Sequence, residues 1–148
     1  MSNYNLNRFI KAQNDAYEIT YLELLNGKKE SDWMPYMFPR IFGLSMNETS
    51  IYYSLNSIDE AKAYLENEIL KERLMTLINV LLNLETNDPV KIFGFPENLE
   101  FWSSITLFYQ IAPEEVVFKK ILEKYFQGRL ELATVDIVKE QRGKIWEY

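Results

Sequence analysis

The sequence predicts an all-helical fold, a compact multihelical domain of about seven or eight helices. Apolar residues recur at helical spacing from one end of the chain to the other. Five Gly and five Pro separate these runs. Val and Ile are too scattered to form a convincing strand. We expect a single domain over residues 1–148, long enough to bury one hydrophobic core without disulfides or metals.

The first predicted helix covers about residues 6–26, and Gly27 is typical of the left-handed residue that ends a helix. Residues 31–43 then read SDWMPYMFPRIFG, with four aromatic residues and two Met. Two prolines four residues apart exclude a long regular helix there. We call residues 33–40 the aromatic loop. Because it is so apolar, we expect it to pack onto the body of the protein or to line a pocket.

Each of the remaining predicted helices begins at a start signal, such as a capping residue, a proline or an acidic first turn. Ser45 to Glu48 and Ser57 to Glu60 match the capping box. Pro113 with two following glutamates predicts another helix start. These helices are expected over about residues 45–52, 57–65, 69–84, 88–94, 96–111, 113–128 and 132–141, and residues 142–148 are expected to form a flexible tail.

Composition excludes several classes of function. The chain has no Cys and no His, which excludes thiolate nucleophiles, Ser-His-Asp hydrolysis and metal sites built on those ligands. We therefore expect no transition metal and no cofactor. The net charge is -6 without a basic stripe, so nucleic-acid binding is not expected. No signal peptide or membrane span is visible, and we expect a cytoplasmic location.

Several sequence blocks together resemble a known bacterial family. They are LNRFIKAQNDAY at residues 6–17, SDWMPYMFP at 31–39, GLS at 43–45, EAKAYL at 60–65, SSITLF at 103–108 and YFQG at 125–128. In this order and spacing they are similar to the family catalogued as domain of unknown function 1810, often labelled "calpastatin", over roughly residues 3–138. The resemblance implies a compact all-helical fold and supplies no reaction, cofactor or partner.

The chain departs from that family's pattern in the aromatic loop and just before it. The family usually has Ser-His-Trp-Met-Trp-Phe-x-Phe-Pro-Gln, whereas this chain has Asp32 for the histidine, Pro35 for the second tryptophan and Arg40 for the glutamine. If the histidine is catalytic in relatives, this chain is a degraded or retuned copy.

The aromatic loop supplies the first set of candidate ligand-binding residues: Trp33, Tyr36, Phe38 and Arg40. The rings are suited to stacking on a flat ligand, and Arg40 is suited to a carboxylate or phosphate. The alternative is structural, with the rings filling the core beneath an irregular loop. Both interpretations stay open from the sequence.

A polar stripe on an otherwise apolar helix supplies the second set: Ser103, Ser104, Thr106 and Gln110. Three of these residues stand at i, i+3 and i+7, which puts them on one helix face. They are suited to contacting a ligand, or alternatively to bonding backbone carbonyls within a tightly packed core. Since short hydroxyls suit the unsatisfied backbone of a proline-bearing loop, we expect this stripe and the aromatic loop to meet.

Other polar residues have simpler structural interpretations. Arg8 is expected to pair with a glutamate of the fold, although a ligand carboxylate is the alternative. Glu97 and Glu100 lie at a predicted helix start, where acids complement the helix dipole. We interpret them as capping acids rather than as the paired carboxylates of a glycosidase.

Three functional hypotheses remain from the sequence. The preferred one is a domain that binds a small polar ligand or a peptide where the aromatic loop meets the polar stripe. The second is an enzyme, a hydrolase or transferase acting on a nucleotide-like metabolite. The third is a protein–protein interaction module with an exposed aromatic patch. The ligand, the pathway and the oligomeric state do not follow from the residues.

Overall fold

The computed structural model describes residues 4–145, and over these residues the chain is helical without a named strand. One isolated parallel bridge joins Ile41 to Leu55. The helices are α1 (Asn7–Leu25), α2 (Met34–Met37), α3 (Glu48–Tyr52), α4 (Ile58–Glu66), α5 (Glu68–Asn83), α6 (Pro89–Phe93), α7 (Glu97–Ile111), α8 (Val116–Phe126) and α9 (Leu132–Ile145). The predicted all-helical class is confirmed. Of the expected tail, residues 142–145 continue α9, and residues 146–148 lie outside the described part.

The described part of the chain has nine helices, one more than the largest number predicted. The additional helix is α2, a single turn inside the aromatic loop. Pro35 lies in the first turn of α2, where the missing proline N–H leaves no helical hydrogen bond unmade. The two prolines therefore exclude a long helix, as predicted, but they permit one turn.

Two predicted helix starts are wrong. Asn47, rather than Ser45, caps α3, because its side-chain oxygen accepts from the first free backbone N–H groups of that helix. Helix α8 begins at Val116, so Glu114 and Glu115 precede the helix instead of forming its first turn. In both cases the true start lies a few residues after the strongest local signal.

Other predicted helix ends are confirmed by the backbone. Gly27, which follows the C-cap Asn26 of α1, has φ of 75°, and Gly94, directly after α6, has φ of 76°. The side chain of Asp88 caps α6, and the side chain of Ser57 caps α4. These signals depend only on neighbouring residues, which is why the sequence locates them well.

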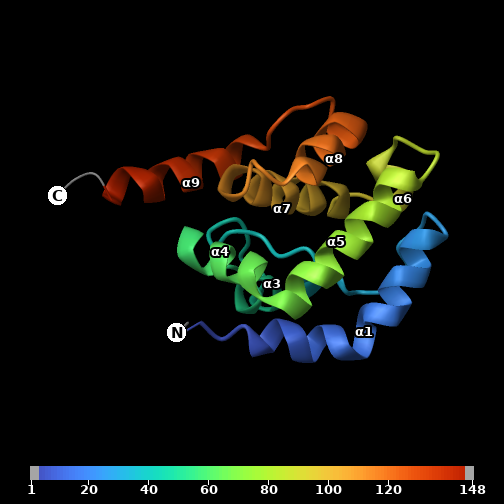
Figure 1. The fold of residues 1–148 in the computed structure, drawn as a ribbon, viewed down its shortest axis with the longest axis horizontal. Helices are drawn as coiled ribbons and strands as arrows, with labels where there is room; N and C mark the ends of the chain where they lie inside the picture. Colours follow the sequence, from blue (N-terminus) through green and yellow to red (C-terminus); the bar gives the residue numbers. More distant parts are fainter. Residues whose placement is uncertain (1–3, 146–148) are drawn as a thin grey trace.

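Helix α7 lies at the centre of the fold. It packs against α2, α4, α6, α8 and α9, while α5 packs against α1, α4 and α8. Figure 1 shows α7, α8 and α9 on one side of the molecule and α1 on the opposite side, with α5 crossing between them. The aromatic loop reaches the core through α2, which contacts both α1 and α7.

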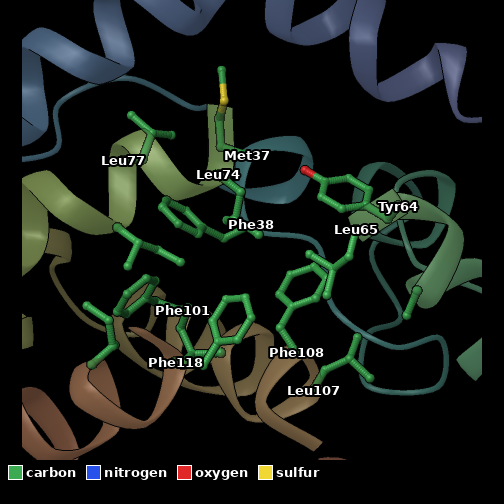
Figure 2. Close-up of a cluster of buried hydrophobic side chains, with 14 of the residues drawn as sticks. Met37, Phe38, Tyr64, Leu65, Leu74, Leu77, Phe101, Leu107, Phe108 and Phe118 are labelled. Carbon is green, nitrogen blue, oxygen red and sulfur yellow. The ribbon is translucent and has the colours of Figure 1, made fainter. Parts of the chain in front are cut away.

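Large rings form much of the hydrophobic core. Figure 2 shows Phe38, Phe101, Phe108 and Phe118 gathered beside the leucines of α5. The ring centroids of Phe38 and Phe101 are 5.0 Å apart, with an edge-to-face angle of 89°. Such pairs prefer edge-to-face geometry and add stability beyond the area they bury. The abundance of aromatic residues in the sequence thus serves mainly the core.

The aromatic loop is attached to α1 through Glu23. Its carboxylate accepts hydrogen bonds from the indole N–H of Trp33 at 2.8 Å and from the hydroxyl of Ser31 at 2.5 Å, and also from the backbone N–H groups of Glu30 and Ser31. Burial raises the pKa of this carboxyl, but the four hydrogen bonds outweigh burial and lower the pKa to about 2. Glu23 therefore fixes where the chain enters the loop.

A buried ion pair joins α1 to α4. The Arg8 guanidinium lies 3.0 Å from a carboxylate oxygen of Glu60, and both side chains are almost fully buried. Arg8 also donates to the carbonyls of Asn5, Tyr52 and Ser54. The structural interpretation of Arg8 is confirmed, since its donors are occupied by the fold.

Two side chains of α8 bond the carboxyl end of α5. The ammonium of Lys124 donates to the carbonyls of Leu82 and Leu84, and the hydroxyl of Tyr125 donates to the carbonyl of Leu81. The last carbonyls of a helix have no partner within the helix. Here the neighbouring helix supplies the partners that a glycine cap supplies elsewhere.

We expect Trp33→Ala to lower the free energy of unfolding by about 3–5 kcal/mol, because it removes a core ring that is 1% exposed. Urea denaturation measures this loss. The control is Tyr52→Ala, which removes a ring that is 56% exposed and should change stability by less than about 1 kcal/mol. Equal effects from the two variants would contradict the structural role given to Trp33.

We expect Glu23→Gln to lower the free energy of unfolding at neutral pH, with a deficit that shrinks in acid. The folded-state pKa lies below the ordinary value of 4.5, so the contribution of Glu23 is complete above pH 4.5. It is lost as the pH falls from there toward about 2. Denaturation curves of both proteins between pH 7 and pH 3 test this, with exposed Glu18→Gln as the control. A deficit that stays constant with pH would be inconsistent with this role.

Candidate functional site

A pocket of about 910 Å³ opens where the aromatic loop meets α7. Its remaining walls come from the segment 44–50 and from the beginning of α9. The loop and the polar stripe of α7 do meet, as predicted, because the hydroxyl of Ser104 donates to the carbonyl of Pro39 at 2.8 Å. That buried bond holds the loop against α7.

One wall of the pocket is a face of α7. Glu97, Glu100 and Ser103 line it, and their spacing of three residues places them on the same side of the helix. Phe101 and Phe108 point into the core instead. The pocket therefore lies against the first half of α7.

Another part of the lining comes from the aromatic loop and the residue just before it, through Pro35, Arg40 and Asp32. The rings of the neighbouring Trp33 and Phe38 point into the core, whereas Asp32, Pro35 and Arg40 are accessible from the pocket. The backbone at Arg40 is fixed, since its carbonyl accepts from the N–H of Leu55 at 2.9 Å.

The rest of the lining is mixed. Pro96, Leu99 and Trp102 supply apolar surface, and the indole of Trp102 is stacked on Phe126 at a centroid distance of 5.3 Å. The segment 44–50 adds hydroxyl and amide groups. Mostly preformed pockets with a few polar groups and an apolar wall are typical of small-molecule sites.

Two ion pairs cross from the loop side to α7, and they differ in geometry. Lys29 and Glu97 are in close contact, with 2.8 Å between nitrogen and oxygen. Arg40 and Glu100 are 3.7 Å apart, beyond hydrogen-bond distance. The side chain of Arg40 is 17% exposed and that of Glu100 is 23% exposed, so both are largely withdrawn from water.

Neither member of the second pair makes a side-chain hydrogen bond within residues 4–145. Burial raises the pKa of the Glu100 carboxyl, and the Arg40 guanidinium opposes that rise. A guanidinium has five N–H donors, and an ionised carboxylate only accepts. The pocket wall thus holds a donor group and an acceptor group with unused hydrogen-bonding capacity.

Glu131 also lines the pocket, but its carboxylate is already engaged by the fold. It accepts from the hydroxyls of Ser103 and Thr134 and from the backbone N–H groups of Ala133 and Thr134 at the start of α9. Burial raises its pKa, yet these hydrogen bonds outweigh burial and the net pKa is lowered. Glu131 therefore joins α9 to the pocket wall.

The candidate residues from the sequence have three different locations. Arg40 and Ser103 line the pocket. Trp33, Phe38, Ser104 and Thr106 are buried, and Thr106 accepts from the backbone N–H of Glu131. The two rings are part of the core. The two hydroxyls are also buried, where Ser104 bonds a backbone carbonyl and Thr106 bonds a backbone N–H.

The remaining two candidates do not line the pocket. Tyr36 is half-buried beside Tyr53, with ring centroids 5.2 Å apart, and burial raises the pKa of its hydroxyl. Gln110 lies near the end of α7, where its backbone carbonyl accepts from Arg142. The polar stripe is thus divided between the pocket, the core and the far end of the helix.

Most of the charged residues that line the pocket were not among the candidates predicted from the sequence. Glu97 and Glu100 are in the first turn of α7, as predicted, but they also face the pocket. The sequence did contain a signal for this polar wall, because Glu97, Glu100 and Ser103 are three residues apart and lie on one face of the helix. Trp102 carried no such signal, since it stands in an apolar run.

Two further properties concern the described residues only. Within residues 4–145, no group of three or more carboxylates is placed to hold a metal ion. No helix in the same range has the length and apolar character required to cross a membrane.

Comparison with known proteins gives the fold a close counterpart. The structure is similar to that of the conserved hypothetical protein Rv1873 from Mycobacterium tuberculosis, with a TM-score of 0.91 and 31% identity over 93% of this chain and 99% of that chain. No curated protein matches the chain. The model of the family described as "Protein of unknown function (DUF1810)" matches residues 3–138, and the chain therefore belongs to the DUF1810 family.

Proposed function

We propose that this protein binds a small polar ligand in the pocket between the aromatic loop and α7, with Arg40 and Glu100 as the contacting charged groups. The observation that carries the proposal is the pair of largely buried charges that line the cavity without hydrogen bonds to the described part of the protein. The polar atoms of both side chains remain accessible to water, since neither residue is among those with a buried polar atom that lacks a partner. A ligand that displaces this water must supply hydrogen bonds to both groups.

The shape and lining of the pocket support a small molecule. A volume of about 910 Å³ lies within the range of metabolite sites. Apolar Leu99 and Trp102 stand beside polar Ser103, so one wall suits the body of a ligand while the charged pair orients it. An interaction module with an exposed aromatic patch has less support, because Trp33 and Phe38 are buried.

The second candidate function is an enzyme that uses Glu100 as a general acid. The raised pKa of this carboxyl favours it, because a general acid must hold its proton near the working pH. Ser103 is a weaker candidate for a nucleophile, since its hydroxyl lies 3.0 Å from both the Leu99 carbonyl and the Glu131 carboxylate. The reaction itself stays undefined.

We expect a broad metabolite screen by thermal shift to identify a ligand that stabilises the wild-type protein. At about 100 times its Kd, a ligand adds roughly 2.7 kcal/mol, which raises the Tm by roughly 5–10 °C for a protein of this size. Arg40→Gln should reduce the affinity by at least about tenfold, which corresponds to about 1.4 kcal/mol.

The matched control for that screen is Lys120→Gln. Lys120 is exposed on α8 and is not part of the pocket, so the variant loses the same charge without touching the site. Its affinity should equal that of the wild type. A screen without any stabilising metabolite, or one whose ligands bind Arg40→Gln as tightly as the wild type, would count against the pocket.

Glu100→Gln separates the enzyme from the binding protein. If Glu100 is a general acid, the variant should still bind substrate, and its turnover should fall by about 100-fold or more. The wild-type rate should then fall as the pH rises through the raised pKa of Glu100, because the proton to be donated is lost. Product formation is followed by mass spectrometry. A ligand that is returned unchanged by the wild-type protein would leave only the binding function.

A further inference from the structure

Arg40 and Glu100 place a pure hydrogen-bond donor directly beside a hydrogen-bond acceptor. Their closest nitrogen and oxygen are 3.7 Å apart, close enough for the charges to offset each other and too far for a hydrogen bond. By contrast, the buried guanidinium of Arg8 contacts its glutamate at 3.0 Å and donates to three carbonyls. The donors of Arg40 are therefore not occupied by the described part of the fold.

We propose, on the premise that this pocket binds a small ligand, that the ligand presents a planar amide edge to it. In this arrangement a carbonyl oxygen accepts from Arg40, and the adjacent N–H donates to Glu100. The ligand class comprises lactam-bearing heterocycles and primary carboxamides.

The dimensions of an amide suit this pair. From the C=O and C–N bond lengths, the oxygen and nitrogen of an amide lie about 2.3 Å apart. Both atoms can therefore face a donor and an acceptor separated by 3.7 Å at the same time. A ligand with only a carboxylate would satisfy Arg40 but would be repelled by Glu100 and Glu97, and a ligand with only an ammonium group would satisfy Glu100 but be repelled by Arg40.

The surrounding surface favours a flat ligand. Leu99 and Trp102 line the pocket next to Glu100, and stacking on Phe126 holds the indole in place. A flat ring offers apolar faces to such a wall and a polar edge to the charged pair. The pocket is also large enough for a ring that carries a further substituent, such as a ribose.

Two pairs of nucleosides test the amide edge with little change of shape. Uridine and inosine carry a ring carbonyl beside a ring N–H, whereas 3-methyluridine and 1-methylinosine carry a methyl group in place of that hydrogen. We expect calorimetry to show uridine or inosine bound at least about tenfold more tightly than its counterpart, because the methylated edge has no donor for the Glu100 carboxylate.

Glu100→Leu should remove this discrimination rather than simply weaken binding. A leucine side chain offers no acceptor to the ring N–H, so the variant should bind the two members of a pair within about threefold of each other. The control is Glu114→Leu, which removes an exposed carboxylate outside the pocket and should keep the wild-type preference.

The possible outcomes separate this inference from the function on which it rests. Equal or reversed affinity within both nucleoside pairs overturns the amide edge, and so does an Arg40-dependent metabolite without an amide group. Either result is still compatible with the proposed function, in which the pocket binds a small ligand. If no compound at all binds in an Arg40-dependent way, the proposed function fails, and the amide edge fails with it.

Discussion

Helix α7 is apolar on most of its surface, and the positions of several other helices follow from the need to cover it. Eight of its residues are buried, among them Ser104 and Thr106. A helix that is apolar on most sides is stable when other helices cover it, and α2, α4, α6, α8 and α9 pack against α7. Its first turn, which carries Glu97 and Glu100, is the part left open.

The buried hydroxyls of α7 decide how the irregular segments attach to it. The hydroxyl of Ser104 donates a hydrogen bond to the carbonyl of Pro39 in the aromatic loop. The hydroxyl of Thr106 accepts one from the backbone N–H of Glu131, just before α9. A buried backbone N–H or C=O without a hydrogen bond lowers the stability of the fold. Each hydroxyl therefore stabilises one irregular segment where it passes over α7. Both segments, the aromatic loop and the chain at the start of α9, contribute residues to the lining of the pocket.

Local signals in the sequence predict the fold well, and the site much less well. Gly27, Gly94 and Asp88 act on their immediate neighbours, so their roles are visible without a structure. The partner of Ser104 is 65 residues away, and no local pattern identifies it. Glu100 looks like an ordinary first-turn acid until the packed loop brings Arg40 beside it. The rings of the aromatic loop suggested a binding surface. In the structure Trp33 and Phe38 are buried instead, because burying large apolar side chains stabilises the fold.

The bonds from Lys124 and Tyr125 to the end of α5 have a consequence for how the protein opens. A helix whose last carbonyls are solvated frays independently, on a fast timescale. The end of α5 is instead held by side-chain donors from α8, so loosening its final turn also breaks these hydrogen bonds to α8. The two helices should therefore behave as one cooperative unit in native-state hydrogen exchange, with amides in the last turn of α5 and in α8 losing protection together.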